Sequence, residues 1–111
     1  MGPGKADLLQ GIAETGSIAA AGRRMGMSYK RAWALAEVLN RMFAEPLVVT
    51  QRGGHDRGGA ALTATGETVL ALFRRMQATA EEATRADADR IQALAAPRLS
   101  GARPPDISER K

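Results

Sequence analysis

Four consecutive polar residues, Ser28 to Arg31, have the most distinctive chemistry in the chain. They place a hydroxyl, a phenol, an ammonium and a guanidinium at the predicted start of a helix. Lys30 and Arg31 would be its second and third residues, where the positive end of the helix dipole disfavours cations by about a few tenths of a kcal/mol. A bound anion would offset that cost. Both side chains pair with guanine edges or phosphates, so the motif indicates a nucleic acid; a solvated helix start is the plainer alternative.

The charge distribution agrees with a polyanionic partner but supports it only weakly. The 111 residues include sixteen Lys and Arg against twelve Asp and Glu, a net charge of +4. Residues 1–62 contain eight basic and five acidic residues, whereas residues 63–96 contain four and five. The basic residues of the first half cluster at Arg23, Arg24, Lys30 and Arg31, then at Arg52 and Arg57. A small positive charge is common on solvated surfaces, so composition alone does not decide the partner.

The inventory of reactive side chains excludes most enzyme chemistry. The chain has no cysteine and one histidine, His55, which removes disulfides, thiolate metal sites, cysteine nucleophiles and histidine-based triads. No acid–base pair or metal cluster can be assembled from the remaining residues. We therefore expect no enzymatic activity, no metal and no cofactor.

No apolar run approaches the length of about 18 residues that spans a membrane, and the first ten residues lack the apolar stretch of a signal peptide. We therefore expect a cytoplasmic protein with no membrane partner.

Two short helices are predicted before the Ser28 motif. Apolar residues at helical spacing favour a first helix over residues 5–14, which Gly16 ends. Ser17 can accept from the free N–H groups of a second helix of about eight residues. The small residues at 19–22 would allow that helix to approach the next one closely, and Gly26 tolerates the positive φ of the intervening turn.

The rest of the chain is predicted to form a third helix, a hairpin and a long last helix. Ser28 caps a helix over residues 29–44, because Pro46 prevents its continuation. β-Forming residues on both sides of a glycine-rich segment indicate a two-stranded hairpin between residues 47 and 63. Thr63 is placed to cap a helix that reaches residue 95, about 48 Å long at about 1.5 Å per residue.

This order of elements is that of a winged helix-turn-helix, a mainly α fold with a small β-hairpin wing, followed by a long C-terminal helix. It predicts a DNA-binding domain at residues 1–63, a long dimerisation helix at residues 64–96 and a disordered tail at residues 97–111.

The predicted fold sends the N-terminal turn of the third helix outward, where it can enter a major groove about 12 Å wide. The candidate contacts to double-stranded DNA are Ser17, Ser28, Tyr29, Lys30, Arg31, Trp33, Ala34, Arg52 and Arg57. Trp33 falls off the inward stripe of its helix, so its edge either contacts DNA or packs in the core. Arg52 and Arg57 either reach the minor groove or backbone from the wing, or belong to an ordinary surface loop.

Several motifs in order resemble a known family. They are GSIAAAGRRMGMSYKRAW, LNRMFAEPLV, a Gly-Gly hairpin and ALTATGETVL, between about residues 2 and 76. Here the chain closely resembles the N-terminal domain of the molybdate-responsive ModE transcription regulators and, more distantly, the DNA-binding domain of LysR-type regulators. The resemblance implies a homodimer that binds operator DNA, with the helix opened by Ser28 as the recognition helix. Full-length ModE regulators add molybdate-binding β-barrel modules that do not fit before Lys111, so molybdate binding is not expected.

The long last helix has more apolar residues than a small domain needs for its own core. The candidate dimer contacts are Val69, Phe73, Met76, Ala80, Ala83 and Leu94. We expect its first two turns to pack on the first helix and the remainder to pair with a second copy; a frayed, exposed end is the alternative. A two-fold dimer would set two recognition helices about 34 Å apart and recognise an inverted repeat. The competing function is a protein-interaction adaptor that uses this helix, with DNA binding lost or secondary.

Overall fold

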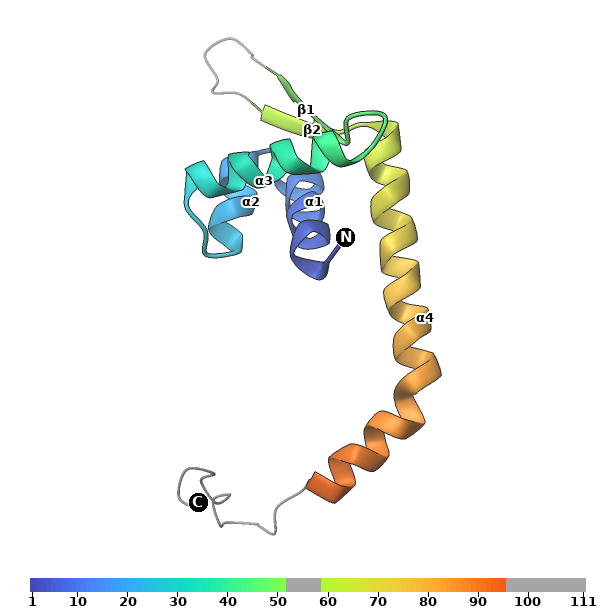
Figure 1. Ribbon diagram of the computed structural model, residues 1–111. Helices are drawn as coiled ribbons and strands as arrows, with labels where there is room; N and C mark the ends of the chain where they lie inside the picture. Colours follow the sequence, from blue (N-terminus) through green and yellow to red (C-terminus); the bar gives the residue numbers. More distant parts are fainter. Residues whose placement is uncertain (52–58, 96–111) are drawn as a thin grey trace. The chain divides into compact units, whose positions relative to one another are not determined.

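The computed structural model describes residues 1–51 and 59–95, which form four helices and one antiparallel pair of strands (Figure 1). The elements are α1 (Pro3–Thr15), α2 (Ile18–Arg24), α3 (Tyr29–Met42), β1 (Val48–Gln51), β2 (Gly59–Leu62) and α4 (Ala64–Ala95). The predicted fold, mainly helical with a hairpin wing and a long last helix, is confirmed. The tail predicted at residues 97–111 and the wing residues Arg52 and Arg57 lie outside the described residues.

Two serines cap the second and third helices, as predicted. Ser17 Oγ accepts a hydrogen bond from the backbone N–H of Ala20 at 3.0 Å, and Ser28 Oγ accepts one from that of Arg31 at 3.1 Å. Each bond satisfies one of the N–H groups that a helix start leaves free. Gly26 has a φ of 72°, the left-handed conformation predicted for the turn between these helices. The start of each helix in the helix-turn-helix pair is thus fixed locally.

Two helix boundaries differ from the sequence prediction. α1 begins at Pro3 rather than at residue 5, because proline at the first helical position has a preset φ and needs no N–H partner. α3 ends at Met42 rather than at residue 44, since Phe43 adopts an extended conformation with φ −121° and ψ 163°. Phe43 is partly buried against the core, so the early end of the helix allows its ring to pack there.

α1, α2 and α3 approach one another so closely that two glycines have no room for a side chain. A Cβ on Gly11 of α1 would lie 2.8 Å from the Cβ of Ala21 in α2. A Cβ on Gly22 of α2 would lie 2.7 Å from the Cβ of Ala32 in α3. Both distances are far shorter than van der Waals contact, so a larger residue at either glycine would push two helices apart.

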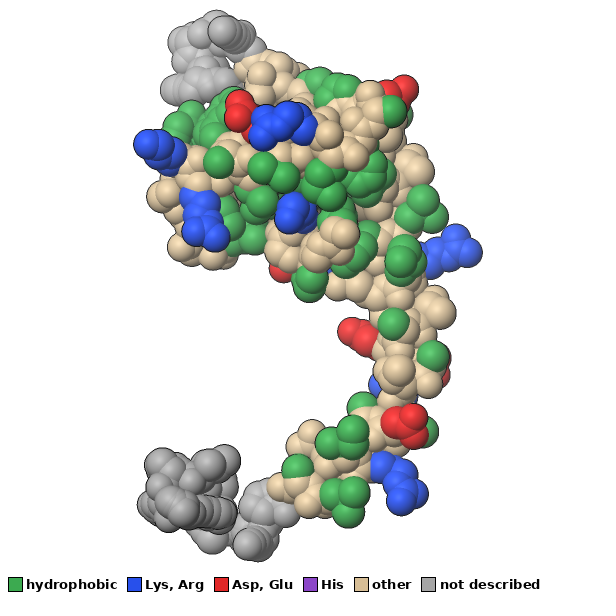
Figure 2. Space-filling model, viewed as in Figure 1, with side chains coloured by type: hydrophobic (Ala, Val, Ile, Leu, Met, Phe, Trp, Pro, Cys, Tyr) green, Lys and Arg blue, Asp and Glu red, His purple; other side chains and the backbone are tan. Residues whose placement is uncertain are grey.

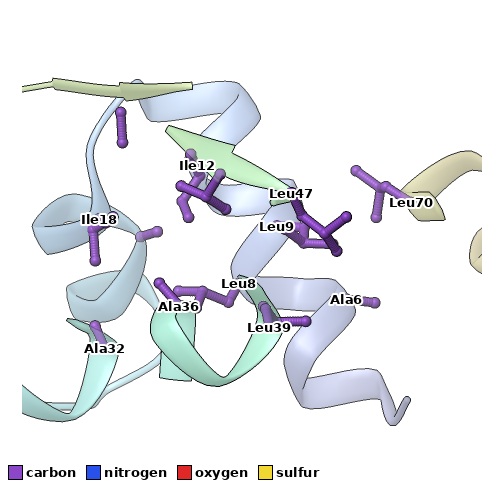
Figure 3. Packing of buried hydrophobic residues seen from close by; sticks show 13 residues of the cluster. Ala6, Leu8, Leu9, Ile12, Ile18, Ala32, Ala36, Leu39, Leu47 and Leu70 are labelled. Carbon is purple, nitrogen blue, oxygen red and sulfur yellow. The ribbon is translucent and has the colours of Figure 1, made fainter. Parts of the chain in front are cut away.

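One hydrophobic core lies between these helices, the wing and the start of α4 (Figure 3). Its largest fully buried side chains are Leu8, Leu9, Ile12, Leu39 and Leu47. Alanines fill the narrow places between the helices, which agrees with a core that contains few aromatic residues. The core therefore depends on close helix packing rather than on large rings.

The first turns of α4 are anchored to this core and to α1. Leu70 is buried in the core. Arg74 Nη2 lies 3.0 Å from Asp7 Oδ1, and Arg74 Nε donates to Gln10 Oε1 at 3.3 Å. The chain divides into two compact units, Met1–Met76 and Gln77–Lys111. The anchored part of α4 thus lies in the same unit as the three short helices.

Asn40 joins the last turn of α3 to the wing. Its Oδ1 accepts from the backbone N–H groups of Leu47 at 2.8 Å and Val48 at 2.9 Å. Its Nδ2 donates to the carbonyl oxygen of Val48 at 2.9 Å. Because Val48 pairs with Leu62 in the strand register, this one amide fixes the position of the hairpin on α3.

Thr63 caps α4, as predicted, and joins it to the segment before β1. Its Oγ1 accepts from the backbone N–H of Gly66 at 2.9 Å and donates to the carbonyl oxygen of Pro46 at 2.8 Å. Gly66 packs directly on the backbone of Leu47, where a Cβ would overlap the carbonyl oxygen. The start of α4 is therefore fixed by a cap and by a close backbone contact.

We expect Asn40→Ala to lower the free energy of unfolding by about 2–4 kcal/mol, because two backbone N–H groups lose their acceptor at a cost of about 1–3 kcal/mol each. Asn40→Asp keeps one acceptor oxygen for the two N–H groups but turns the other oxygen toward the carbonyl oxygen of Val48, so it should also be destabilising. Urea unfolding followed by circular dichroism measures both variants. A loss below about 0.5 kcal/mol in Asn40→Ala, the size of an ordinary surface substitution, would contradict the role given to this amide.

Candidate nucleic-acid interface

The N-terminal turn of α3 is exposed. Tyr29 retains 61% of its accessible surface, and Ser28, Lys30 and Arg31 are also exposed. Within residues 1–51 and 59–95, neither Lys30 nor Arg31 forms an ion pair. The two cations therefore stand at the positive end of the helix without a counter-charge from the described chain.

Four exposed residues follow one line along the outward face of α3. Lys30, Ala34, Glu37 and Arg41 are separated by four, three and four residues, which places them one above another on a helix. The buried residues of the same helix are Ala32, Ala36 and Leu39. Glu37 and Arg41 were not among the predicted contacts, although their spacing from Lys30 in the sequence already places them on the same face of a helix.

Trp33 lies beside this line and packs partly against the core. Its ring meets that of Tyr29 edge to face, with centroids 6.2 Å apart and planes at 66°. Its Nε1 is buried, with no hydrogen-bond partner in the described part of the chain. The packing shows that Trp33 contributes to the core and supports the ring of Tyr29, and its contact with DNA stays a prediction.

Of the two other predicted contacts in the described residues, one lies on α3 and one at the start of α2. Ala34 is exposed on α3, one turn beyond Lys30. Ser17 is half-buried and begins α2, where its Oγ is used in the cap. The structure thus groups Ser28, Tyr29, Lys30 and Ala34 on one helix and places Ser17 at the start of another.

The two arginines at the end of α2 differ in their partners. Arg24 Nη1 lies 2.6 Å from Glu14 Oε1, and Glu14 also accepts from Gln10 Nε2 at 2.8 Å. The hydrogen bonds from Arg24 and then from Gln10 lower the pKa of Glu14 below its ordinary value. Arg23 is exposed and has no ion pair among the described residues. The charge of Arg24 is therefore used within the protein, whereas that of Arg23 faces outward.

The surface that contains α2 and α3 carries basic, apolar and acidic side chains (Figure 2). Figure 2 shows Lys and Arg side chains over these helices with hydrophobic side chains between them.

Among the described residues, no three His, Cys, Asp or Glu side chains are grouped to hold a metal ion. None of the helices in that part of the chain combines the length and apolarity that a bilayer span requires.

The known proteins with similar sequences include members of the family that the sequence motifs resemble. The molybdenum-pterin-binding protein MopB of Rhodobacter capsulatus is 42% identical over 78 residues, 70% of this chain and 29% of that protein. The transcriptional regulator ModE of Haemophilus influenzae is 37% identical over 81 residues, 73% of this chain and 32% of that protein. This chain is homologous to the ModE-type regulators. The chain spans less than a third of the length of these curated relatives, and no family model matches it.

Solved structures show the same fold. The DNA-binding domain of CbnR, crystallised in complex with DNA, matches with a TM-score of 0.61 at 26% identity, over 86% of this chain and 99% of the CbnR chain. Full-length LysG from Corynebacterium glutamicum matches with a TM-score of 0.61 at 22% identity, over 84% and 30% of the two chains. This chain thus has the winged-helix fold of LysR-type DNA-binding domains, and the predicted resemblance to both families is confirmed.

The ion pair at Glu14 predicts a measurable titration. NMR should place the pKa of the Glu14 carboxyl below its ordinary value of 4.5, because the hydrogen bond from Arg24 favours the charged form. The stability that this lowered pKa contributes should be present above pH 4.5 and lost as the pH falls through the pKa of the folded protein. Arg24→Gln should return the pKa toward 4.5, whereas Arg23→Gln should leave it unchanged. A pKa of 4.5 or higher in the parent chain would show that the pair does not form in solution.

Proposed function

We propose that this chain is a DNA-binding transcriptional regulator and that α3 enters the major groove of double-stranded DNA. The observation that supports this most is the exposed pair Lys30 and Arg31, two cations at the positive end of a helix with no counter-charge in the described residues. A phosphate or a guanine edge supplies that counter-charge. The names of the relatives, which include transcriptional regulators, and the DNA complex of CbnR support the same function.

The shape of the site also suits duplex DNA. An α-helix with its side chains is about 10–12 Å across, close to the width of the major groove at about 12 Å. The cap at Ser28 leaves the first turn of α3 exposed. The proposed contacts around Lys30 and Arg31 are Ser17, Ser28, Tyr29, Trp33, Ala34, Arg52 and Arg57. Of these, the two wing arginines would reach the minor groove or the phosphate backbone of the DNA.

We propose that this chain acts as a regulator and not as an enzyme. The curated relatives include transcriptional regulators, and they match this chain over less than a third of their own length. What the remainder of those proteins binds is therefore not carried over to this chain. No cofactor is part of the proposed function.

We further propose that α4 joins two copies of the chain, so that the dimer recognises an inverted repeat. Met76, Ile91 and Leu94 retain 65%, 67% and 81% of their accessible surface, and every residue from 78 to 95 is exposed. Helices in proteins gain most of their stability from packing of an amphipathic face, and pairing with a second copy would bury the apolar stripe of this one. The proposed contacts with most surface available are Met76, Ala80, Ala83 and Leu94. Val69 and Phe73 already pack partly against the core of their own chain.

The double variant Lys30→Ala/Arg31→Ala tests DNA binding. We expect its affinity for the best duplex selected by the parent chain to fall at least about tenfold. The slope of log affinity against log salt should shrink by about 1 for each phosphate that the variant no longer neutralises. Mobility-shift assays over a range of salt concentrations measure both. The control Arg75→Ala/Arg85→Ala removes the same charge from exposed positions on α4 and should retain most of the affinity.

Unchanged affinity in the α3 double variant would show that α3 is not the recognition helix. Binding of a partner protein through the apolar face of α4, with little dependence on salt and no duplex binding by the parent, would support the adaptor function instead.

Leu94→Glu tests the dimer. It places a charge on the apolar stripe of α4, so the dissociation constant of the dimer should rise at least about tenfold. Gln92→Glu adds the same charge to an exposed position on the opposite side of the helix and should leave the dimer intact. Sedimentation equilibrium measures the mass, which for the parent should be twice the chain mass of 11.7 kDa. A parent chain that sediments as a monomer at all concentrations would contradict the proposal.

A further inference from the structure

Glu37 places a carboxylate in the middle of the outward line of α3. It is exposed, seven residues beyond Lys30 and four before Arg41. The spacing to Arg41 would allow an ion pair along the helix, but within the described residues Glu37 forms none. The face proposed to meet a polyanion therefore contains one free negative charge at its centre.

We propose that Glu37 is a specificity-determining residue that accepts a hydrogen bond from the N4 amino group of a cytosine. This inference rests on the proposed function, since it assumes that α3 lies in the major groove. An ionised carboxylate only accepts hydrogen bonds. In the major groove, guanine and thymine present acceptor oxygens that repel it, while cytosine presents the N4 donor without an acceptor beside it. Adenine presents a donor next to the N7 acceptor, which suits an amide better than a carboxylate.

The position of Glu37 on the helix sets where this cytosine should lie. Lys30 and Glu37 are seven residues apart on one face, which is about 10 Å along the helix axis. That distance places Glu37 opposite a different base pair from Lys30. Ala34 lies between them on the same line, where its methyl group can contact the methyl group of a thymine. The half-site should therefore contain a guanine opposite the start of α3 and a cytosine at a separate position a few base pairs away.

The free carboxylate also acts against binding of the wrong sequence. Near phosphates or acceptor oxygens it is repelled, and only a donor from a base offsets that repulsion. Removing the negative charge should therefore strengthen binding to unrelated duplexes while weakening the preference for one base. If Glu37 did not contact a base, removing its charge would strengthen binding to unrelated duplexes and leave the base preference unaltered.

The test is a selection from a pool of randomised DNA duplexes with the full chain, run in parallel for the parent, Glu37→Gln and Glu37→Ala. At one position of each half-site the parent should prefer cytosine about tenfold over the other bases. Glu37→Gln should change that preference to adenine, because glutamine pairs with adenine N6 and N7. Glu37→Ala should show no preference there, and the rest of the motif should be the same in all three. Circular dichroism confirms that each variant is folded.

Glu81→Gln is the matched control, because it removes the same charge from an exposed position on α4. It should give the parent motif with cytosine intact. Identical motifs from the parent and both Glu37 variants would overturn the role of Glu37 and leave the proposed function standing. A parent chain that enriches no motif at all would instead overturn sequence-specific DNA binding, and the role of Glu37 with it.

Discussion

The close approach of α1, α2 and α3 is the constraint on which the rest of the structure depends. Gly11 and Gly22 leave no room for a β-carbon against Ala21 and Ala32. Helices in such contact have little freedom to slide or rotate, because every displacement brings backbone against backbone. The left-handed turn at Gly26 then fixes how α3 departs from α2. As a consequence, the first turn of α3 points away from the core and its side chains remain exposed.

The charges divide into those that hold the domain together and those that face outward. Arg24 pairs with Glu14 and Arg74 pairs with Asp7, so both pairs join elements of the first unit. Such exposed pairs are each worth little in stability, but they leave no net charge where they lie. Lys30, Arg31 and Arg41, by contrast, have no ion pair in the described chain. These three unpaired cations lie on the exposed side of α3, and this coincidence of charge and shape favours a polyanionic ligand.

The sequence predicted best those features that depend on a few neighbouring residues. Ser28 and Thr63 were identified as caps because a hydroxyl at a helix start needs a partner only two or three residues away. Asn40 could not be identified in this way, since its bonds to the segment before and within β1 exist only after the chain has reversed direction. Gly11 was missed for the same reason, because its neighbour Ala21 belongs to another helix. The early end of α3 depends on the packing of Phe43, which no local pattern encodes.

The central claim is that the exposed face of α3 contacts duplex DNA. An NMR titration of the ¹⁵N-labelled chain with a selected duplex at low salt tests it directly, because it reports every backbone amide separately. The amides from residue 28 to residue 41 should show the largest shifts and broadening, while those from residue 78 to residue 95 should change much less. Shifts confined to the latter range, with α3 unaffected by the duplex, would contradict the claim.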